Sequence, residues 1–310
     1  MGTPEFAVPS LEILIRHYYP IQAVVTAPDK PRGRGQQLSH TPLKVFALKH
    51  NLDVLQPESL KDPSFVDRLK KLRPELMVVV AFRILPKEVF TIPSLGAFNL
   101  HASLLPKYRG AAPIHWAIIN GEIETGVTTF LLKEKVDTGN VVLQGRIPIR
   151  PDDHAGTVHD RLAEVGAEIV LHTVRLIEQG KANPRAQDDT LATPAPKILK
   201  KDCEIFWNQP ALSIHNRIRG LSPYPTAFTV HRGKMLKIYR SQLVDAPAHG
   251  SPGDVEVSRT SLHVATADKM LALVELQQEG RKKMHAEEFL RGYRFVEGDR
   301  LGAGTGKEEE

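Results

Sequence analysis

The chain has 310 residues, of which 41% are hydrophobic and 25% are charged, and its formal net charge is +5 at pH 7. This composition excludes fibrous and intrinsically disordered proteins, and the length is sufficient for two domains with separate cores. The single cysteine, Cys203, cannot form an internal disulfide. A membrane-spanning helix needs about 20 consecutive apolar residues, and no run in this sequence is that long. We therefore expect a cytoplasmic protein with no membrane association, whose mildly basic charge fits a polyanionic partner without requiring one.

The N-terminal part of the chain alternates strand and helix patterns. Four apolar runs of strand length predict strands buried on both faces of a parallel sheet, at 21–27, 52–56, 75–82 and 96–102. Helical patterns separate them, several opened by a capping or first-turn Thr, Ser, Asp or Pro, at 4–17, 41–51, 62–73 and 86–92. The expected fold class is α/β, with a doubly wound and mostly parallel sheet.

A hairpin and a long helix complete this first domain. Residues 125–135 and 140–149 predict two strands joined by the short loop VDTG. Residues 157–180 predict a helix with apolar side chains at helical spacing. Composition then changes, because residues 181–202 are polar, rich in Pro and Ala and without periodicity, which indicates an interdomain linker.

The C-terminal part is expected to form a second, smaller domain. Residues 210–221 predict a helix, and the short alternating runs that follow, broken by Gly, Asp and Pro, favour a small antiparallel, OB-like β-barrel. We expect the two domains to span 1–180 and 203–300, followed by a disordered tail over 301–310.

The densest chemistry lies between residues 98 and 139. Asn99 and His101 are two residues apart at the end of a predicted strand, so both side chains project from the same face of the sheet. Ligands bind at the carboxyl ends of strands in open α/β sheets, where an amide and an imidazole can polarise a carbonyl and move a proton. Asp137, in the turn after a later strand, could orient or charge that imidazole. Each residue alone also has a structural interpretation, but the combination favours a site.

The loop 103–113 follows this strand without a break. Pro106 and Pro113 stiffen it, and it mixes apolar side chains with the cations Lys107 and Arg109. Such a loop is typical of the wall of a pocket for a flat, partly apolar ligand. A dinucleotide is not expected as that ligand, because no G-x-G-x-x-G motif follows a predicted strand.

Residues 29–44 form a basic segment that is rich in glycine. Its cations are Lys30, Arg32, Arg34 and Lys44. A flexible basic segment can follow phosphates or enter the splayed end of an RNA stem. The alternative is an ordinary solvated surface loop, and charge alone does not decide between the two.

The stretch NLHASLLPKYRGAAPIHWAIINGEIETGVTTF with the later VDTGNVV closely resembles the core of the formyltransferases that use 10-formyltetrahydrofolate. Further stretches narrow the resemblance to the members of this family that formylate methionyl-tRNA. These stretches are GTPEFAVPSL, PDKPRGRGQQL, DDTLATPAPKI, IRGLSPYPTAF and GRKKMHAEEFLRG. The resemblance covers essentially the whole chain.

The resemblance implies a catalytic first domain of Rossmann-like formyltransferase type and a C-terminal domain that binds tRNA. It implies that Asn99, His101 and Asp137 form the active site, with the first two stabilising an oxyanion. The residues implied to line the folate site are Ser103, Leu104, Leu105 and Pro106. The expected co-substrate is 10-formyltetrahydrofolate and the expected partner is initiator methionyl-tRNA, with the segment 29–44 on its acceptor stem. We expect a monomer that needs no metal.

Two alternatives stay open at this point. The same core serves formyl transfer to glycinamide ribonucleotide or to an amino sugar nucleotide, and only the C-terminal barrel and the segment 29–44 argue for tRNA. A catalytically idle tRNA-binding protein is the other alternative, and the intact set of Asn99, His101 and Asp137 argues against it. For Asp137 itself two roles are open, pairing with the imidazolium or accepting the proton of the attacking amine.

The start of the chain also carries an expectation. The resemblance implies a short apolar strand immediately before GTPEFAVPSL, and the chain begins at the residue before that glycine. In a doubly wound sheet this first strand lies in the middle, and its absence leaves buried backbone groups unpaired. We therefore expect Met1 to be an internal methionine preceded by roughly five to ten mostly apolar residues.

Overall fold

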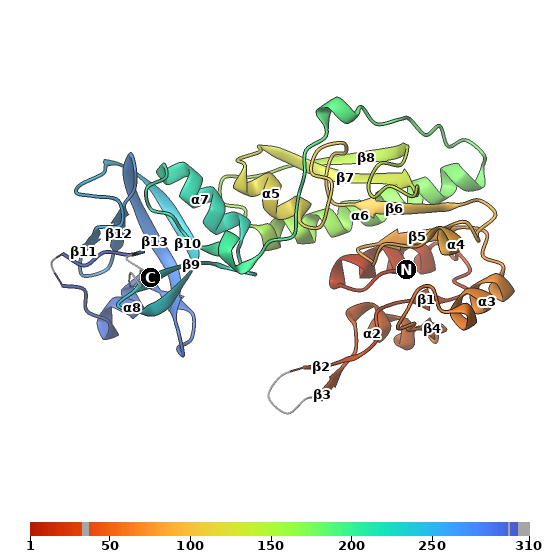
Figure 1. Ribbon diagram of the computed structural model, residues 1–310, viewed down its shortest axis with the longest axis horizontal. Coiled ribbons are helices and arrows are strands. Elements are labelled where there is room, and N and C mark those ends of the chain that lie inside the picture. Colours follow the sequence, from red (N-terminus) through yellow and green to blue (C-terminus); the bar gives the residue numbers. More distant parts are fainter. Residues whose placement is uncertain (33–36, 297, 303–310) are drawn as a thin grey trace, which may run out of the picture. The chain divides into compact units, whose positions relative to one another are not determined.

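The computed structural model describes residues 1–32, 37–296 and 298–302 (Figure 1). The chain forms two compact units. Unit 1 comprises Met1–Pro113, Glu124–Pro148 and His159–Pro196. Unit 2 comprises Ile114–Ile123, Ile149–Val158 and the chain from Lys197 onward. None of the helices in the described part of the chain has the length and apolar character needed to cross a membrane.

The helices and strands up to residue 196 include every element expected from the sequence, and also β2, β3, α5 and η2, which the sequence analysis did not predict. They are η1 Glu5–Ala7, α1 Val8–Arg16, β1 Val24–Val25, β2 Lys30–Arg32, β3 Gln37–Ser39, α2 Pro42–Lys49, β4 Val54–Leu55, α3 Pro63–Leu72, β5 Met77–Val80, α4 Lys87–Phe90, β6 Ala97–His101, α5 Pro113–Ile119, β7 Glu124–Leu131, β8 Val141–Pro148, α6 Ala155–Glu178 and η2 Asp189–Leu191. The expected α/β class is confirmed.

The sheet of unit 1 is mixed. β5 pairs with β6 in parallel, whereas β6–β7 and β7–β8 are antiparallel, and β1 pairs with β4 in parallel as a separate two-stranded piece. The short connection between β7 and β8 requires an antiparallel pair, since a parallel pair needs a crossover of a dozen or more residues. The parallel part is therefore smaller than expected from the sequence.

Helix α6 covers one face of this sheet. A Cβ atom built on Gly166 of α6 would lie 2.7 Å from a side-chain carbon of Leu100, and the hydroxyls of Thr129 and Thr173 lie 2.7 Å apart. Side chains alternate between the two faces of a strand. Because Leu100 of β6 faces α6, the neighbouring Asn99 and His101 project from the opposite face, where the candidate site lies.

A gap separates β1 from β5. Gly2 lies in it and bridges both strands, donating from its nitrogen to the Val25 carbonyl at 3.0 Å and pairing with Val80. Beside it lies a cavity of about 340 Å³, lined by apolar side chains that include Met77 and Leu14.

Unit 2 is built on an antiparallel sheet in the order β11-β12-β13-β10-β9, with β14 paired to β13. Its elements are η3 Lys200–Cys203, α7 Ala211–Gly220, β9 Ala227–His231, β10 Lys234–Pro247, β11 Val255–Val257, β12 Leu262–Ala265, β13 Lys269–Gln278, β14 Met284–His285 and α8 Ala286–Gly292. The antiparallel domain is confirmed. Within the described residues, however, β9 and β11 do not pair with each other, so the expected barrel is not closed.

The core of unit 2 extends to the end of the described chain. Leu301 is 3% exposed and packs in the same cluster as Leu236 and Leu262. Its nitrogen donates to the Gly253 carbonyl at 2.9 Å. The first residue of the expected disordered tail, Leu301, is therefore ordered. Residues 303–310 of that tail lie outside the described residues.

A buried histidine, His231, lies on β9 of unit 2. His231 is 2% exposed, and its Nδ1 lies 2.5 Å from the Tyr293 hydroxyl. Its Nε2 lies 3.4 Å from Asp299 Oδ2, without the geometry of a hydrogen bond. Burial lowers the pKa of His231 below its ordinary 6.5, and the Asp299 carboxylate offsets this only in part.

This lowered pKa predicts a loss of stability in acid. The unfolded chain takes up the proton at a higher pH than the folded one, so the free energy of unfolding falls as the pH drops below about 6.5. Replacing the histidine, His231→Gln, removes this term. We expect its melting temperature to depend less steeply on pH between about 7.5 and 5.5 than that of the wild type. Identical slopes would contradict the prediction, and the exposed His249→Gln is the matched control.

Candidate active site

Strand β6 ends in the predicted pair of polar side chains. Asn99 is half-buried and pairs in register with Phe130, and His101, 7% exposed, pairs with Thr128. The amide of Asn99 makes no hydrogen bond to any residue that the structure describes. A half-buried amide without a protein partner is available to bind a ligand.

The imidazole of His101 has one nitrogen committed to the protein. Nε2 lies 2.8 Å from the backbone carbonyl of Tyr108. A carbonyl oxygen only accepts, so Nε2 carries the proton of this bond. Nδ1 is left to face the carboxylate of Asp137, whose Oδ2 lies 3.9 Å away. That distance is too long for a hydrogen bond, but a carboxylate and an imidazolium attract each other across it.

Asp137 lies in the connection between β7 and β8, with its backbone in the left-handed region at φ 55°. Its side chain is 12% exposed, and Oδ2 accepts a hydrogen bond from the Gly110 nitrogen at 2.9 Å. Nearby, a Cβ atom on Gly139 would lie 1.7 Å from the Leu131 carbonyl oxygen, so only glycine fits there. The turn thus places Asp137 beside His101, and a joint catalytic role of the two residues stays a prediction.

The first part of the loop 103–113 is tied to β7 by a single hydroxyl. Thr128 Oγ1 donates to the Ser103 carbonyl at 2.6 Å and accepts from the Leu105 nitrogen at 3.1 Å. Gln144 donates to the same hydroxyl at 3.0 Å and to the Leu105 carbonyl at 2.9 Å. Ser103 and Leu105 are buried, so these backbone groups are committed to the protein.

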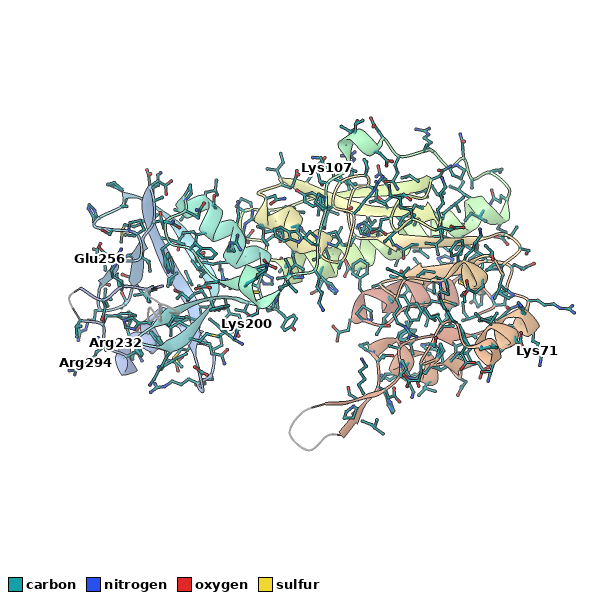
Figure 2. All side chains as sticks on the ribbon, in the orientation of Figure 1. Lys71, Lys107, Lys200, Arg232, Glu256 and Arg294 are labelled. Carbon is teal, nitrogen blue, oxygen red and sulfur yellow. The ribbon has the colours of Figure 1, made fainter. Side chains whose placement is uncertain are left out.

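The residues expected to line a folate site therefore differ in accessibility. Ser103 Oγ donates to the Lys107 carbonyl at 2.6 Å, which leaves it inside the loop. Leu104 and Pro106 are half-buried and alternate with the buried Ser103 and Leu105. A role for these four residues in binding folate stays a prediction. Figure 2 shows Lys107 on the same loop.

The second part of this loop pairs with residues 193–195, which lie within the predicted linker 181–202. The Arg109 nitrogen donates to the Thr193 carbonyl at 2.9 Å, and the Ala195 nitrogen donates to the Arg109 carbonyl at 2.7 Å. Farther back, Val141 and Arg185 exchange two backbone hydrogen bonds of 2.8 Å. We call residues 185–195 the strap. It belongs to unit 1, and the predicted domain boundaries stay a prediction.

Sequence reasoning missed the residues that hold the site together. Thr128 binds the backbone of the loop 103–113, and the Tyr108 carbonyl accepts from His101. Arg109 binds the side chain of Gln187 in the strap. Arg109 is 15% exposed and pairs through Nη2 with Asp189 Oδ1 at 2.6 Å. No periodicity or motif marks these roles. The one local feature that singles out any of these residues is the positive charge of Arg109 next to Gly110.

The basic segment forms the hairpin β2–β3, whose strands pair from Lys30 with Ser39 to Arg32 with Gln37. Lys30 is exposed. Arg34 lies outside the described residues, and of Arg32 only the backbone is described. These three residues stay predicted contacts to tRNA.

Lys44 is already engaged by the protein. Its Nζ donates to Asp29 Oδ2 at 2.5 Å and to Gln56 Oε1 at 2.6 Å, and its side chain is only 16% exposed. The hydrogen bond from Lys44, followed by that from Gln56, lowers the pKa of Asp29 to about 2. We infer that Lys44 anchors the base of the hairpin, which leaves little of its charge for a phosphate.

No group of three or more His, Cys, Asp or Glu side chains placed to share a metal ion occurs within the described ranges. The cavity between β1 and β5 is not lined by Asn99, His101 or Asp137. The polar groups available to a substrate are thus the Asn99 amide, His101 Nδ1 and the Asp137 carboxylate. An amide donor, an imidazole and a carboxylate suit the transfer of an acyl group.

Comparison with known families gives two matches that together span most of the chain. Residues 3–174 match the formyl transferase family, and residues 197–294 match the formyl transferase C-terminal domain. The strap lies between the two matches, within residues 175–196.

Curated relatives match along nearly the whole chain. The methionyl-tRNA formyltransferase of Caldanaerobacter subterraneus subsp. tengcongensis is 50% identical over 300 residues, which cover 96% of this chain and 97% of the relative. That of Syntrophus aciditrophicus is 47% identical over 304 residues, with 97% of each chain covered.

Solved structures share the fold at lower identity. A sugar 3N-formyltransferase, WlaRD, solved with dTDP and 5-N-formyl-THF, has a TM-score of 0.66 and 21% identity, covering 91% of this chain and 97% of that one. The N-formyltransferase of Helicobacter canadensis, in complex with folinic acid and dTDP-3-aminofucose, has a TM-score of 0.65 and 22% identity, covering 88% and 97%.

The role of Thr128 in holding the loop is testable with Thr128→Val. This change leaves the Leu105 nitrogen and the Ser103 carbonyl without their buried partner, so we expect a loss of about 1–3 kcal/mol in the free energy of unfolding. Chemical unfolding measures it. The matched control is Thr125→Val on the same strand, because Thr125 is also buried but its hydroxyl makes no hydrogen bond within the described residues. Equal losses in the two variants would contradict the assignment.

Proposed function

The chain belongs to the methionyl-tRNA formyltransferases of the formyl transferase family, and from that premise we propose that it transfers the formyl group of 10-formyltetrahydrofolate to the α-amino group of methionine on initiator tRNA. The observation that carries this proposal is the unpartnered Asn99 amide on the same strand face as His101, whose free Nδ1 faces Asp137. These groups suit an acyl transfer that uses neither a covalent nucleophile nor a metal.

The reaction exchanges one bond for another. The neutral α-amino nitrogen adds to the formyl carbon, and the carbonyl oxygen becomes an oxyanion. The tetrahedral intermediate then breaks the bond between the formyl carbon and N10 of the folate. N10 takes up a proton, and the new amide nitrogen loses one. The protein must stabilise the oxyanion and move the proton.

Asn99 and His101 are assigned to the oxyanion. The Asn99 amide has no competing partner among the described residues, so its N–H groups can donate to the oxygen. His101 can donate only from Nδ1, because Nε2–H is bound to the Tyr108 carbonyl. Donation from Nδ1 requires the doubly protonated ring. Preorganised donors of this kind stabilise a transition state by about 2.7–4 kcal/mol each.

Asp137 is assigned to the imidazolium of His101. Its Oδ2 lies 3.9 Å from Nδ1, where a negative charge stabilises a positive ring. The hydrogen bond from the Gly110 nitrogen holds the same oxygen in place. The alternative role, accepting the proton of the amine, is distinguished by Asp137→Asn. If Asp137 acts through His101, the pH–rate profile changes shape and part of the rate survives, whereas an unchanged profile at a greatly reduced rate indicates proton transfer.

A folate donor is supported by the two formyltransferases of the same fold that were solved with 5-N-formyl-THF and with folinic acid. The half-buried Leu104 and Pro106 are the candidates to cover the apolar face of the pterin. For tRNA, the candidates are the hairpin β2–β3 and the C-terminal domain. The expected monomeric state and cytoplasmic location stay predictions.

The substrate is tested by direct competition. Purified protein with 10-formyltetrahydrofolate is offered initiator methionyl-tRNA, elongator methionyl-tRNA, glycinamide ribonucleotide and an amino sugar nucleotide in parallel. We expect formylation of the initiator tRNA. Formylation of a small acceptor but not of tRNA would overturn the proposal, and tRNA binding without formylation would indicate a non-catalytic protein.

The oxyanion role predicts the behaviour of Asn99→Ala. Because the donor acts on charge that develops in the transition state, we expect kcat to fall by about 10²–10³, with KM for tRNA changed by less than about threefold. Steady-state kinetics with both substrates measures this. Asn183→Ala, at an exposed position of unit 1, is the control. A kcat within about threefold of wild type would remove Asn99 from the mechanism.

The hairpin predicts a salt-dependent contact. We expect Arg34→Ala to raise KM for tRNA and to reduce the slope of log affinity against log salt by about 1, because one phosphate contact is lost. Formylation of a small acceptor such as methionine amide should not change. Lys71→Ala, an exposed cation of α3 labelled in Figure 2, is the control. An equal loss with the small acceptor would assign the hairpin another role.

A further inference from the structure

The strap carries one side chain that contacts the turn of Asp137. Gln187 Nε2 donates to the Asp137 carbonyl at 2.9 Å and to the Gly139 carbonyl at 2.8 Å. Its Oε1 accepts from Arg109 Nε at 3.1 Å and from Arg109 Nη2 at 2.8 Å. One amide therefore joins the turn after β7 to the loop after β6.

The chemistry of these partners allows only one orientation of the Gln187 amide. Carbonyl oxygens only accept hydrogen bonds, and a guanidinium only donates them. The amide must turn its two N–H donors to the carbonyls and its oxygen to Arg109. Both donors and both lone pairs are then used, so the side chain has no capacity left to act on a substrate.

The backbone of the turn that carries Asp137 needs hydrogen bonds that hold its conformation. Asp137 is a non-glycine residue in the left-handed region, at φ 55°, and it persists there only where neighbouring groups hold it. The carboxylate that faces His101 belongs to the same residue whose carbonyl Gln187 holds. Moving that backbone moves the carboxylate.

The strap itself is anchored on both sides of Gln187. Before it, Arg185 exchanges two backbone hydrogen bonds with Val141 of β8. After it, the Asp188 side chain caps the short helix η2, and Thr193 pairs with Arg109. Arg109 also holds Asp189 at 2.6 Å. Gln187 thus acts from a fixed support.

We propose that Gln187 is a positioning residue for the formyl transfer, holding the backbone of Asp137 so that its carboxylate faces His101 Nδ1. This inference rests on the proposed function and adds the strap to the catalytic apparatus. It predicts that Gln187 contributes to turnover only while Asp137 carries a carboxylate.

Two variants separate the two halves of the Gln187 amide. Gln187→Glu keeps oxygens toward Arg109 but replaces the donors with an acceptor facing two carbonyls. Gln187→Met keeps the length of the side chain and removes every hydrogen bond. We expect each to lower kcat by about tenfold or more, with KM for folate and for tRNA changed by less than about threefold. The control is Gln179→Glu, the same change at an exposed position of unit 1.

A double-mutant cycle with Asp137→Asn distinguishes a positioning role of Gln187 from a purely structural one, because a purely structural role would lower kcat equally whether or not Asp137 is present. In that background we expect Gln187→Glu and Gln187→Met to lower kcat by less than about twofold, because the carboxylate to be positioned is absent. The same loss in both backgrounds would overturn the proposal. So would wild-type kinetics of both variants, or the loss of folding of both.

Failure of the proposal and failure of the proposed function are distinguishable in this experiment. If the wild-type protein does not formylate methionyl-tRNA, the function is wrong. If the wild type is active and the cycle is additive, the function stands and the role of Gln187 is wrong. Unfolding midpoints of all variants, measured alongside, show which of them retain the fold.

Discussion

The site depends on the hydrogen bond from His101 Nε2 to the carbonyl of Tyr108, 2.8 Å away. Because a carbonyl oxygen only accepts, this bond keeps a proton on Nε2 and leaves Nδ1 as the nitrogen that can act on a substrate. It also joins the end of β6 to the loop that follows. Because Nδ1 faces Asp137, a formyl group that reacts with the help of His101 must lie near these two side chains.

Around this nitrogen the protein uses hydrogen bonds to backbone groups as supports and leaves the substrate-facing groups free. Thr128 ties down the loop 103–113, Gly110 holds the carboxylate of Asp137, and Gln187 holds its backbone. Of the three site side chains, Asn99, His101 and Asp137, that of Asn99 makes no hydrogen bond within the described residues. Donors that are already oriented cost no reorganisation when charge develops on the substrate, which is the physical basis of catalysis by such a site.

Local patterns in the sequence were enough to predict much of this arrangement. Because Asn99 and His101 are two residues apart, they lie on one face of β6. The apolar periodicity predicts most helices and strands of unit 1, though not β2, β3 or η2, because both signals are local. Gln187 could not be predicted, since its partner Arg109 is 78 residues away in the chain and the stretch around it has no period. The ion pair of Lys44 with Asp29 could not be predicted either, since 15 residues separate the two in the chain, and a contact of Lys44 with tRNA stays a prediction.

The central claim is that the free protein already holds the His101 imidazole with its proton on Nε2. Nitrogen-15 NMR of histidine-labelled protein tests it, with the His101 signals assigned by comparison with His101→Gln. In the neutral ring we expect the chemical shift of Nε2 to be that of a protonated nitrogen and the shift of Nδ1 that of an unprotonated one. A neutral ring protonated on Nδ1 would contradict the account, because Nε2 could then not donate to the Tyr108 carbonyl.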